Sequence, residues 1–143
     1  MRKSLTLCCD ANIVVRFGAD KQDRAVQSLF DEWRRDGRRI VAPQLFRFEV
    51  TNALYRLRRA NVLSADSARD ALEAALRLPI ELISSEEMHQ QASDIAARFN
   101  RPAAYDAHYL ALAESLGADF WTADQRLFNT VQHELPWVHL VGS

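Results

Sequence analysis

The chain has 143 residues, of which 48 % are apolar and 26 % charged, as expected for one folded domain spanning residues 1–143. The net charge of −1 gives no general attraction to nucleic acid, and no apolar run reaches the ~20 residues that a membrane-spanning helix requires. Because the chain also begins without the apolar core and cleavage site of a signal peptide, we expect a cytoplasmic protein with no membrane contact.

Short apolar segments alternate with segments of helical periodicity along the whole chain. Strands are predicted at residues 5–9, 38–43, 80–84, 119–122 and 137–141. Helices are predicted at residues 12–17, 20–36, 44–60, 64–78, 84–100, 104–116 and 125–131, with caps at Asp20, Ser64, Ser84 and Thr122. This alternation predicts an α/β fold with a parallel sheet covered by helices on both faces.

Two cysteines, Cys8 and Cys9, are adjacent in the first predicted strand. Neighbouring residues of a strand point to opposite faces of the sheet, so these two side chains cannot readily form a disulfide with each other. We expect both to be small core residues without a redox role.

Acidic residues follow two of the predicted strands. Asp10 comes directly after the strand at 5–9, and Asp124 comes just after the strand at 119–122. The carboxyl ends of parallel strands meet at one edge of the sheet, where α/β folds bind their ligands. Each acid is also well placed to stabilise the start of the helix that follows it, so the positions alone do not decide between the two roles.

Glu49 and Asp106 are acids on predicted helices. Glu49 falls within the apolar stripe of its helix, where a carboxylate is costly unless it has a partner; an ion pair with Arg47 or Arg56 is one possibility. Asp106 lies at the N-terminal edge of an apolar stripe, where it could also simply favour the helix dipole.

Four carboxylates that converge on one sheet edge would oppose one another's ionisation unless a cation neutralises them. Ligands that are all oxygen favour Mg²⁺ or Mn²⁺, and such ions bind phosphate oxygens. Asn12 beside Asp10, and Thr122 beside Asp124, could orient a water molecule or a phosphate oxygen. The pattern therefore points to phosphodiester or phosphoryl chemistry.

At these residues the sequence resembles the PIN-domain family. The segments LCCDANIVV, FEVTNAL, YDAHYLALAESLGADFW and TAD resemble the four motifs of that family in order, and together they span residues 7–124. By this resemblance the family's acidic quartet corresponds to Asp10, Glu49, Asp106 and Asp124. One departure is Asn12, which stands where many members carry Ser or Thr and which affects the expected positioning of substrate.

The length and the single domain look most like the toxin of bacterial VapBC toxin–antitoxin pairs. The resemblance implies a Rossmann-like α/β/α sandwich and a metal-dependent endoribonuclease that cleaves RNA with a metal-activated water. It also implies a homodimer and a small VapB-like antitoxin that covers the active site.

On this hypothesis the expected ligands of Mg²⁺ (or Mn²⁺) are Asp10 and Asp106, with Asp124 close to the ion or holding a second one. Glu49 is expected to bind through water or to help deprotonate the attacking water. Arginines close in sequence to the acids are candidates for holding the RNA backbone, namely Arg16, Arg47 and Arg126.

Two other classes of protein remain open from the sequence. An aspartate-based phosphatase or receiver domain would also place Asp10 at a strand end, but both need a lysine late in the chain and none follows Lys21. A PIN-like domain that only mediates interactions would keep the fold without binding a metal.

Overall fold

The computed structural model describes residues 5–142; the outermost residues of the expected domain, 1–4 and 143, lie outside that range. The described residues form a sheet of five strands: β1 Thr6–Cys9, β2 Arg39–Pro43, β3 Ile80–Ile83, β4 Asp119–Thr122 and β5 Val138–Leu140. The helices among the same residues are α1 Ala11–Ala19, α2 Arg24–Arg35, α3 Leu45–Arg59, α4 Ala65–Arg77, α5 Glu86–Arg98, α6 Tyr105–Leu116 and α7 Gln125–Val131.

All neighbouring strands run parallel, in the order β3-β2-β1-β4-β5. The chain moves outward from β1 through β2 to β3 and then returns to place β4 on the other side of β1. The strand order thus reverses between β1 and β4. In open α/β sheets a crevice forms outside the carboxyl ends of the strands at such a reversal, and ligands bind there.

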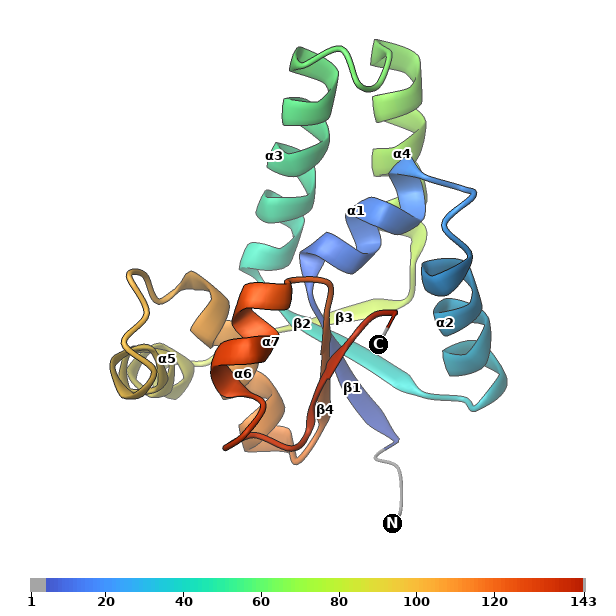
Figure 1. Cartoon of the computed structure of the whole chain (residues 1–143). Coiled ribbons are helices and arrows are strands. Elements are labelled where there is room, and N and C mark those ends of the chain that lie inside the picture. Colours follow the sequence, from blue (N-terminus) through green and yellow to red (C-terminus); the bar gives the residue numbers. More distant parts are fainter. Residues whose placement is uncertain (1–4, 143) are drawn as a thin grey trace.

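Helices cover both faces of the sheet, as predicted. On one face α6 packs against β1, β2 and β4, and α5 packs on α6. On the other, α1 contacts β4, α2, α3 and α4. Figure 1 shows α5 and α6 to the left of the sheet, α2 to its right, and α3 and α4 as a helical hairpin at the top. The arrangement confirms the expected α/β/α sandwich with a parallel sheet.

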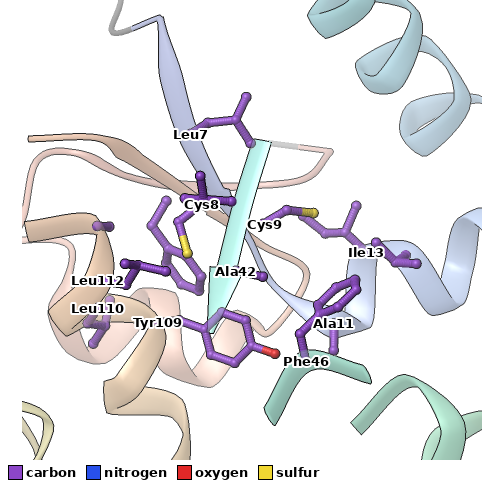
Figure 2. Close-up of a cluster of buried hydrophobic side chains, with 14 of the residues drawn as sticks. Leu7, Cys8, Cys9, Ala11, Ile13, Ala42, Phe46, Tyr109, Leu110 and Leu112 are labelled. Atoms are coloured by element: carbon purple, nitrogen blue, oxygen red, sulfur yellow. The ribbon is translucent and has the colours of Figure 1, made fainter. Parts of the chain in front are cut away.

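The central strand β1 is the most deeply buried part of the sheet. Leu7, Cys8 and Cys9 have no exposed surface, as expected for a strand packed on both faces. Figure 2 shows the Cys8 sulfur on the side of α6 and the Cys9 sulfur on the side of α1. Burial raises the pKa of both thiols well above the usual range, which agrees with the prediction that they are inert core residues.

Three predicted helix caps were wrong. Asp20 instead accepts a hydrogen bond from the Gln22 backbone N–H in a turn, and α2 starts later with Asp23 as its cap. Ser85, rather than Ser84, caps α5. Thr122 remains part of β4, and Asp124 caps α7. The helix predicted at 12–17 is longer and covers Ala11–Ala19.

Helices α1 and α4 approach each other closely at Gly18. A Cβ atom at this position would lie 2.9 Å from the Ala71 carbonyl oxygen and 3.2 Å from the Ala71 Cβ atom. The absence of a side chain at Gly18 therefore allows α4 to pack on α1. Across the described residues, none of the helices combines the length and the apolar character needed to cross a membrane.

Candidate active site

The four predicted acids line one open groove at the carboxyl end of the sheet. The groove has a volume of about 620 Å³. Asp10 and Asp124 reach it from the ends of β1 and β4, Glu49 from α3 and Asp106 from the first turn of α6. Its other lining residues are Ala11, Asn12, Val15, Arg16, Asn52, Ala53, Arg56, Leu57 and Ala123. The structure thus brings the whole quartet together at the point where the strand order reverses.

Asp10 lies at the floor of the groove and is almost completely buried, with 7 % of its surface exposed. Its backbone N–H donates to the carbonyl oxygen of Trp121 at 3.0 Å, which joins the ends of β1 and β4. Its Oδ2 atom accepts hydrogen bonds from the Thr122 hydroxyl at 2.8 Å and from Asn12 Nδ2 at 3.3 Å. Asp10 occupies the cap position of α1, but its side chain makes no capping hydrogen bond.

The surroundings of Asp10 disfavour its negative charge. The pKa of this carboxyl is raised to about 7: burial raises it most, the Thr122 hydrogen bond lowers it, and the charges of Asp106 and Glu49 raise it. The two other acids therefore lie close enough to repel the charge on Asp10. This repulsion was the reason for expecting a cation, because a cation would favour the ionised forms of all three.

Asn12 and Thr122 hold Asp10 and the turn after β4. Asn12 Nδ2 also donates to Thr122 Oγ1 at 3.3 Å, and Asn12 Oδ1 accepts from the Ala123 backbone N–H at 3.0 Å. Thr122 Oγ1 accepts from the Asp124 backbone N–H at 3.0 Å. Both polar groups are thus used to fix two of the acids. Asn12 lines the groove, and its contact with substrate stays a prediction, whereas Thr122 is fully buried and does not line the groove.

Glu49 has a partner that the sequence did not indicate. Its Oε1 atom accepts a 2.6 Å hydrogen bond from the hydroxyl of Tyr109 in α6, and among residues 5–142 it forms no ion pair with Arg47 or Arg56. Burial raises the pKa of Glu49, the Tyr109 hydrogen bond lowers it, and the charge of Asp106 raises it.

Asp106 and Asp124 are each held by protein donors through one oxygen. Asp106 Oδ2 lies 3.2 Å from Nη2 of Arg101, which precedes α6. Asp124 Oδ1 accepts from the backbone N–H groups of Arg126 and Leu127 at 3.0 and 3.1 Å and so caps α7. Asp124 therefore has the helix-stabilising role that the sequence left open, while its side chain also lines the groove.

The donor set in the groove is chemically suited to Mg²⁺ or Mn²⁺, because it consists of carboxylate oxygens with amide and hydroxyl oxygens beside them. As the side chains stand, however, no three Asp, Glu, His or Cys side chains in residues 5–142 are close enough together to hold a metal ion. Glu49 and Asp106 bond to protein partners instead. A cation bound directly by Asp10 and Asp106 would require these two side chains to come closer together, whereas Glu49 is expected to bind through water.

Of the three arginines predicted to hold RNA, only Arg16 lines the groove. Its Nε atom lies 2.8 Å from Oδ2 of Asp23, the residue that caps α2. Arg47 and Arg126 are exposed and are not part of the groove lining. Closeness in sequence to an acid was thus a poor guide for side chains on a different face of a helix.

The sequence reasoning missed two polar groove residues on α3, Asn52 and Arg56. They lie three and seven residues after Glu49, which is the spacing of one helix face. That periodicity could have identified them once Glu49 was assigned to the site. The partnerships of Tyr109 and Arg101 with the acids carried no comparable signal.

Comparison with known proteins agrees with this geometry. Residues 8–136 match the family model of the PIN domain. VapC ribonuclease Mb0985 from Mycobacterium bovis is 35 % identical over 98 residues, which span 68 % of this chain and 75 % of that protein. Ribonuclease VapC9 from Mycobacterium tuberculosis matches with the same identity and coverage.

Two solved structures share the fold. A toxin–antitoxin complex from Klebsiella pneumoniae aligns with a TM-score of 0.64 at 16 % identity, covering 93 % of this chain and 95 % of that one. PAE2754 from Pyrobaculum aerophilum aligns with a TM-score of 0.62 at 21 % identity, covering 87 % and 84 %. With the family match over nearly the whole chain, the fold and the sequence lead to one conclusion: this chain belongs to the PIN-domain family.

Proposed function

We propose that this chain is a metal-dependent endoribonuclease and the toxin of a toxin–antitoxin pair. The observation that carries the proposal is the convergence of Asp10, Glu49, Asp106 and Asp124 on one groove at the strand-order reversal. The curated relatives are named as ribonucleases, which supports RNA as the substrate. An aspartate-based receiver domain is disfavoured, because that fold has the strand order 2-1-3-4-5 and this sheet does not.

In the proposed site Asp10 and Asp106 would hold Mg²⁺ or Mn²⁺ directly, and Asp124 would contribute from the neighbouring strand end. A bound divalent cation supplies Lewis-acid stabilisation of the charge that develops on a scissile phosphate. Glu49, whose pKa is raised by burial, would bind the cation through water and would accept a proton from that attacking water. Thr122 and Asn12 keep Asp10 oriented during these events.

Arg16 and Arg56 are the proposed contacts for the RNA backbone, because both line the groove that holds the acids. Asp23 fixes the Arg16 guanidinium group through Nε and Nη2, which lowers the entropy lost when Arg16 binds a phosphate. Arg47 and Arg126 remain candidates only for RNA that extends beyond the groove.

The proposed partners are a small VapB-like antitoxin and a second copy of this chain. The antitoxin proposal is supported by the solved Klebsiella pneumoniae structure with this fold, which is a toxin–antitoxin complex. Light scattering of the purified protein tests for a homodimer, and cell fractionation tests the expected cytoplasmic location.

Cleavage of a mixed RNA pool by the purified protein tests the proposal. Wild-type protein should cleave with Mg²⁺ or Mn²⁺ and not with EDTA, and Asp10→Asn should lose cleavage while remaining folded. Asp94→Asn is the matched control, because Asp94 is an exposed acid on α5 outside the groove lining. Folded, partner-free wild-type protein that cleaves no RNA with either ion would instead support a PIN domain that only mediates interactions.

A further inference from the structure

Tyr109 brings a hydroxyl group to the acid groove from inside the protein core. The side chain is completely buried, and its ring packs against Phe120 of β4 with a centroid distance of 5.8 Å. Figure 2 shows the hydroxyl oxygen pointing from α6 toward the start of α3, near Phe46. A buried hydroxyl group is costly unless it has a hydrogen-bond partner.

That partner is Glu49, which is 60 residues away in sequence. The hydroxyl donates to Glu49 Oε1 at 2.6 Å, a short distance typical of a bond to a charged acceptor. Among residues 5–142 no other side chain or backbone group bonds to the Glu49 carboxylate. The pKa of Tyr109 is raised first by burial and then by the charges of Asp10 and Glu49, so the phenol remains a neutral donor.

We propose that Tyr109 is a positioning residue of the active site: its hydroxyl holds one oxygen of Glu49 and leaves the other free to act in the groove. The inference rests on the proposed function, because it assigns Tyr109 a part in organising the same cation site. Glu49 lines the groove together with Asp10 and Asp106. Holding a carboxylate in one orientation before a cation binds removes part of the entropy cost of binding.

The hydroxyl and the ring of Tyr109 can be separated experimentally. Tyr109→Phe keeps the ring that packs on Phe120 and removes only the donor to Glu49. Outer partners of metal ligands typically contribute about 10- to 100-fold to metal affinity or activity, so we expect Mn²⁺ affinity to fall within that range. Tyr55→Phe is the matched control, because Tyr55 is exposed on α3 and its hydroxyl has no hydrogen bond within residues 5–142.

A double-mutant cycle distinguishes positioning from packing. Mn²⁺ binding is measured by electron paramagnetic resonance on the full chain, with thermal unfolding as a check that each variant is folded. If Tyr109 acts through Glu49, Tyr109→Phe should change affinity less than about twofold in the Glu49→Gln background. An equal loss in both backgrounds would assign Tyr109 to packing and overturn the proposal, as would unchanged affinity in Tyr109→Phe.

A second variant tests the same contact from the other side. Glu49→Asp keeps the charge but shortens the side chain, which withdraws the carboxylate from the Tyr109 hydroxyl, and it should lose affinity by a similar factor. Wild-type affinity in Glu49→Asp would contradict the proposal. Wild-type protein that neither binds Mn²⁺ nor cleaves RNA would overturn the proposed function and this inference together. If the wild type binds Mn²⁺ but the affinity losses of Tyr109→Phe and Glu49→Gln are additive, only the inference is overturned.

Discussion

The Thr122 hydroxyl donates a 2.8 Å hydrogen bond to Oδ2 of Asp10, so the last residue of β4 holds the first residue after β1. This contact crosses the point where the strand order reverses. The same hydroxyl oxygen accepts from the Asp124 backbone N–H at 3.0 Å. One side chain therefore links two acids of the proposed site, and its removal should affect both stability and metal binding.

Thr122→Val should destabilise the protein by about 1.5–3 kcal/mol at pH 8, the usual contribution of a hydrogen bond to a charged group. The loss should be smaller at pH 5, where Asp10 is protonated because its pKa is raised to about 7. Chemical denaturation at the two pH values measures the difference. Thr122→Ser retains the hydroxyl and serves as the control; equal losses in Thr122→Val at both pH values would show that the charge on Asp10 does not set the strength of this hydrogen bond.

Asp10→Asn should raise the melting temperature in EDTA at pH 8. The folded-state pKa of Asp10 is raised to about 7 from a usual value of 3.8. The free energy of unfolding therefore falls progressively as pH rises from 3.8 to about 7, because the folded state resists ionisation of Asp10 more than the unfolded state does. The full cost, at most roughly 4 kcal/mol, is present above pH 7 and absent below the unfolded pKa.

Scanning calorimetry from pH 5 to pH 8 measures this effect. The stabilisation by Asp10→Asn should grow across the range, and saturating Mn²⁺ should raise the melting temperature of the wild type but not of the variant. An Asp10→Asn variant that is less stable than the wild type at pH 8 in EDTA would refute the view that the buried charge of Asp10 destabilises the fold.

Arg101→Ala should tighten Mn²⁺ binding about two- to fivefold at low salt. Arg101 lies 3.2 Å from Asp106 and is expected to compete with a cation for that carboxylate; partly exposed ion pairs of this kind contribute up to about 1 kcal/mol. Isothermal titration with Mn²⁺ measures the change. Arg98→Ala is the control, since Arg98 forms a similar ion pair with Glu134 outside the groove. Weaker binding in Arg101→Ala would mean that Arg101 orients Asp106 rather than competing for it.

Gly18→Ala should destabilise the protein, although replacing Gly by Ala in a helix interior usually increases stability by about 0.5–1 kcal/mol. The new methyl group would lie 2.9 Å from the carbonyl oxygen of Ala71, which is part of the α4 backbone and cannot move alone. Overpacking of this kind typically costs about 1–3 kcal/mol. Urea denaturation that shows a more stable Gly18→Ala variant would contradict the close packing of α1 on α4.

The positions of three of the four acids could be predicted because each follows from a local rule. Asp10 and Asp124 come after strands that are parallel neighbours, and Glu49 interrupts an apolar helix face. The partners of these acids could not be predicted. Tyr109 on α6 reaches Glu49 on α3 only because α6 packs on the sheet, and this tertiary contact leaves no local pattern in the sequence. Thr122 was misassigned as a helix cap because its pattern fits a capping box, while the strand register directs its hydroxyl to Asp10.

The two buried cysteines of β1 can serve as a probe of whether the central sheet is folded. Cys8 and Cys9 face opposite layers of the sandwich, and their raised pKa keeps them as unreactive thiols while the sheet is intact. A thiol reagent can therefore label them only when the central strand opens, which also separates Asp10 from Trp121 and Thr122. For any inactive variant, the rate of thiol labelling would thus show whether activity was lost because a catalytic side chain was removed or because the protein unfolded.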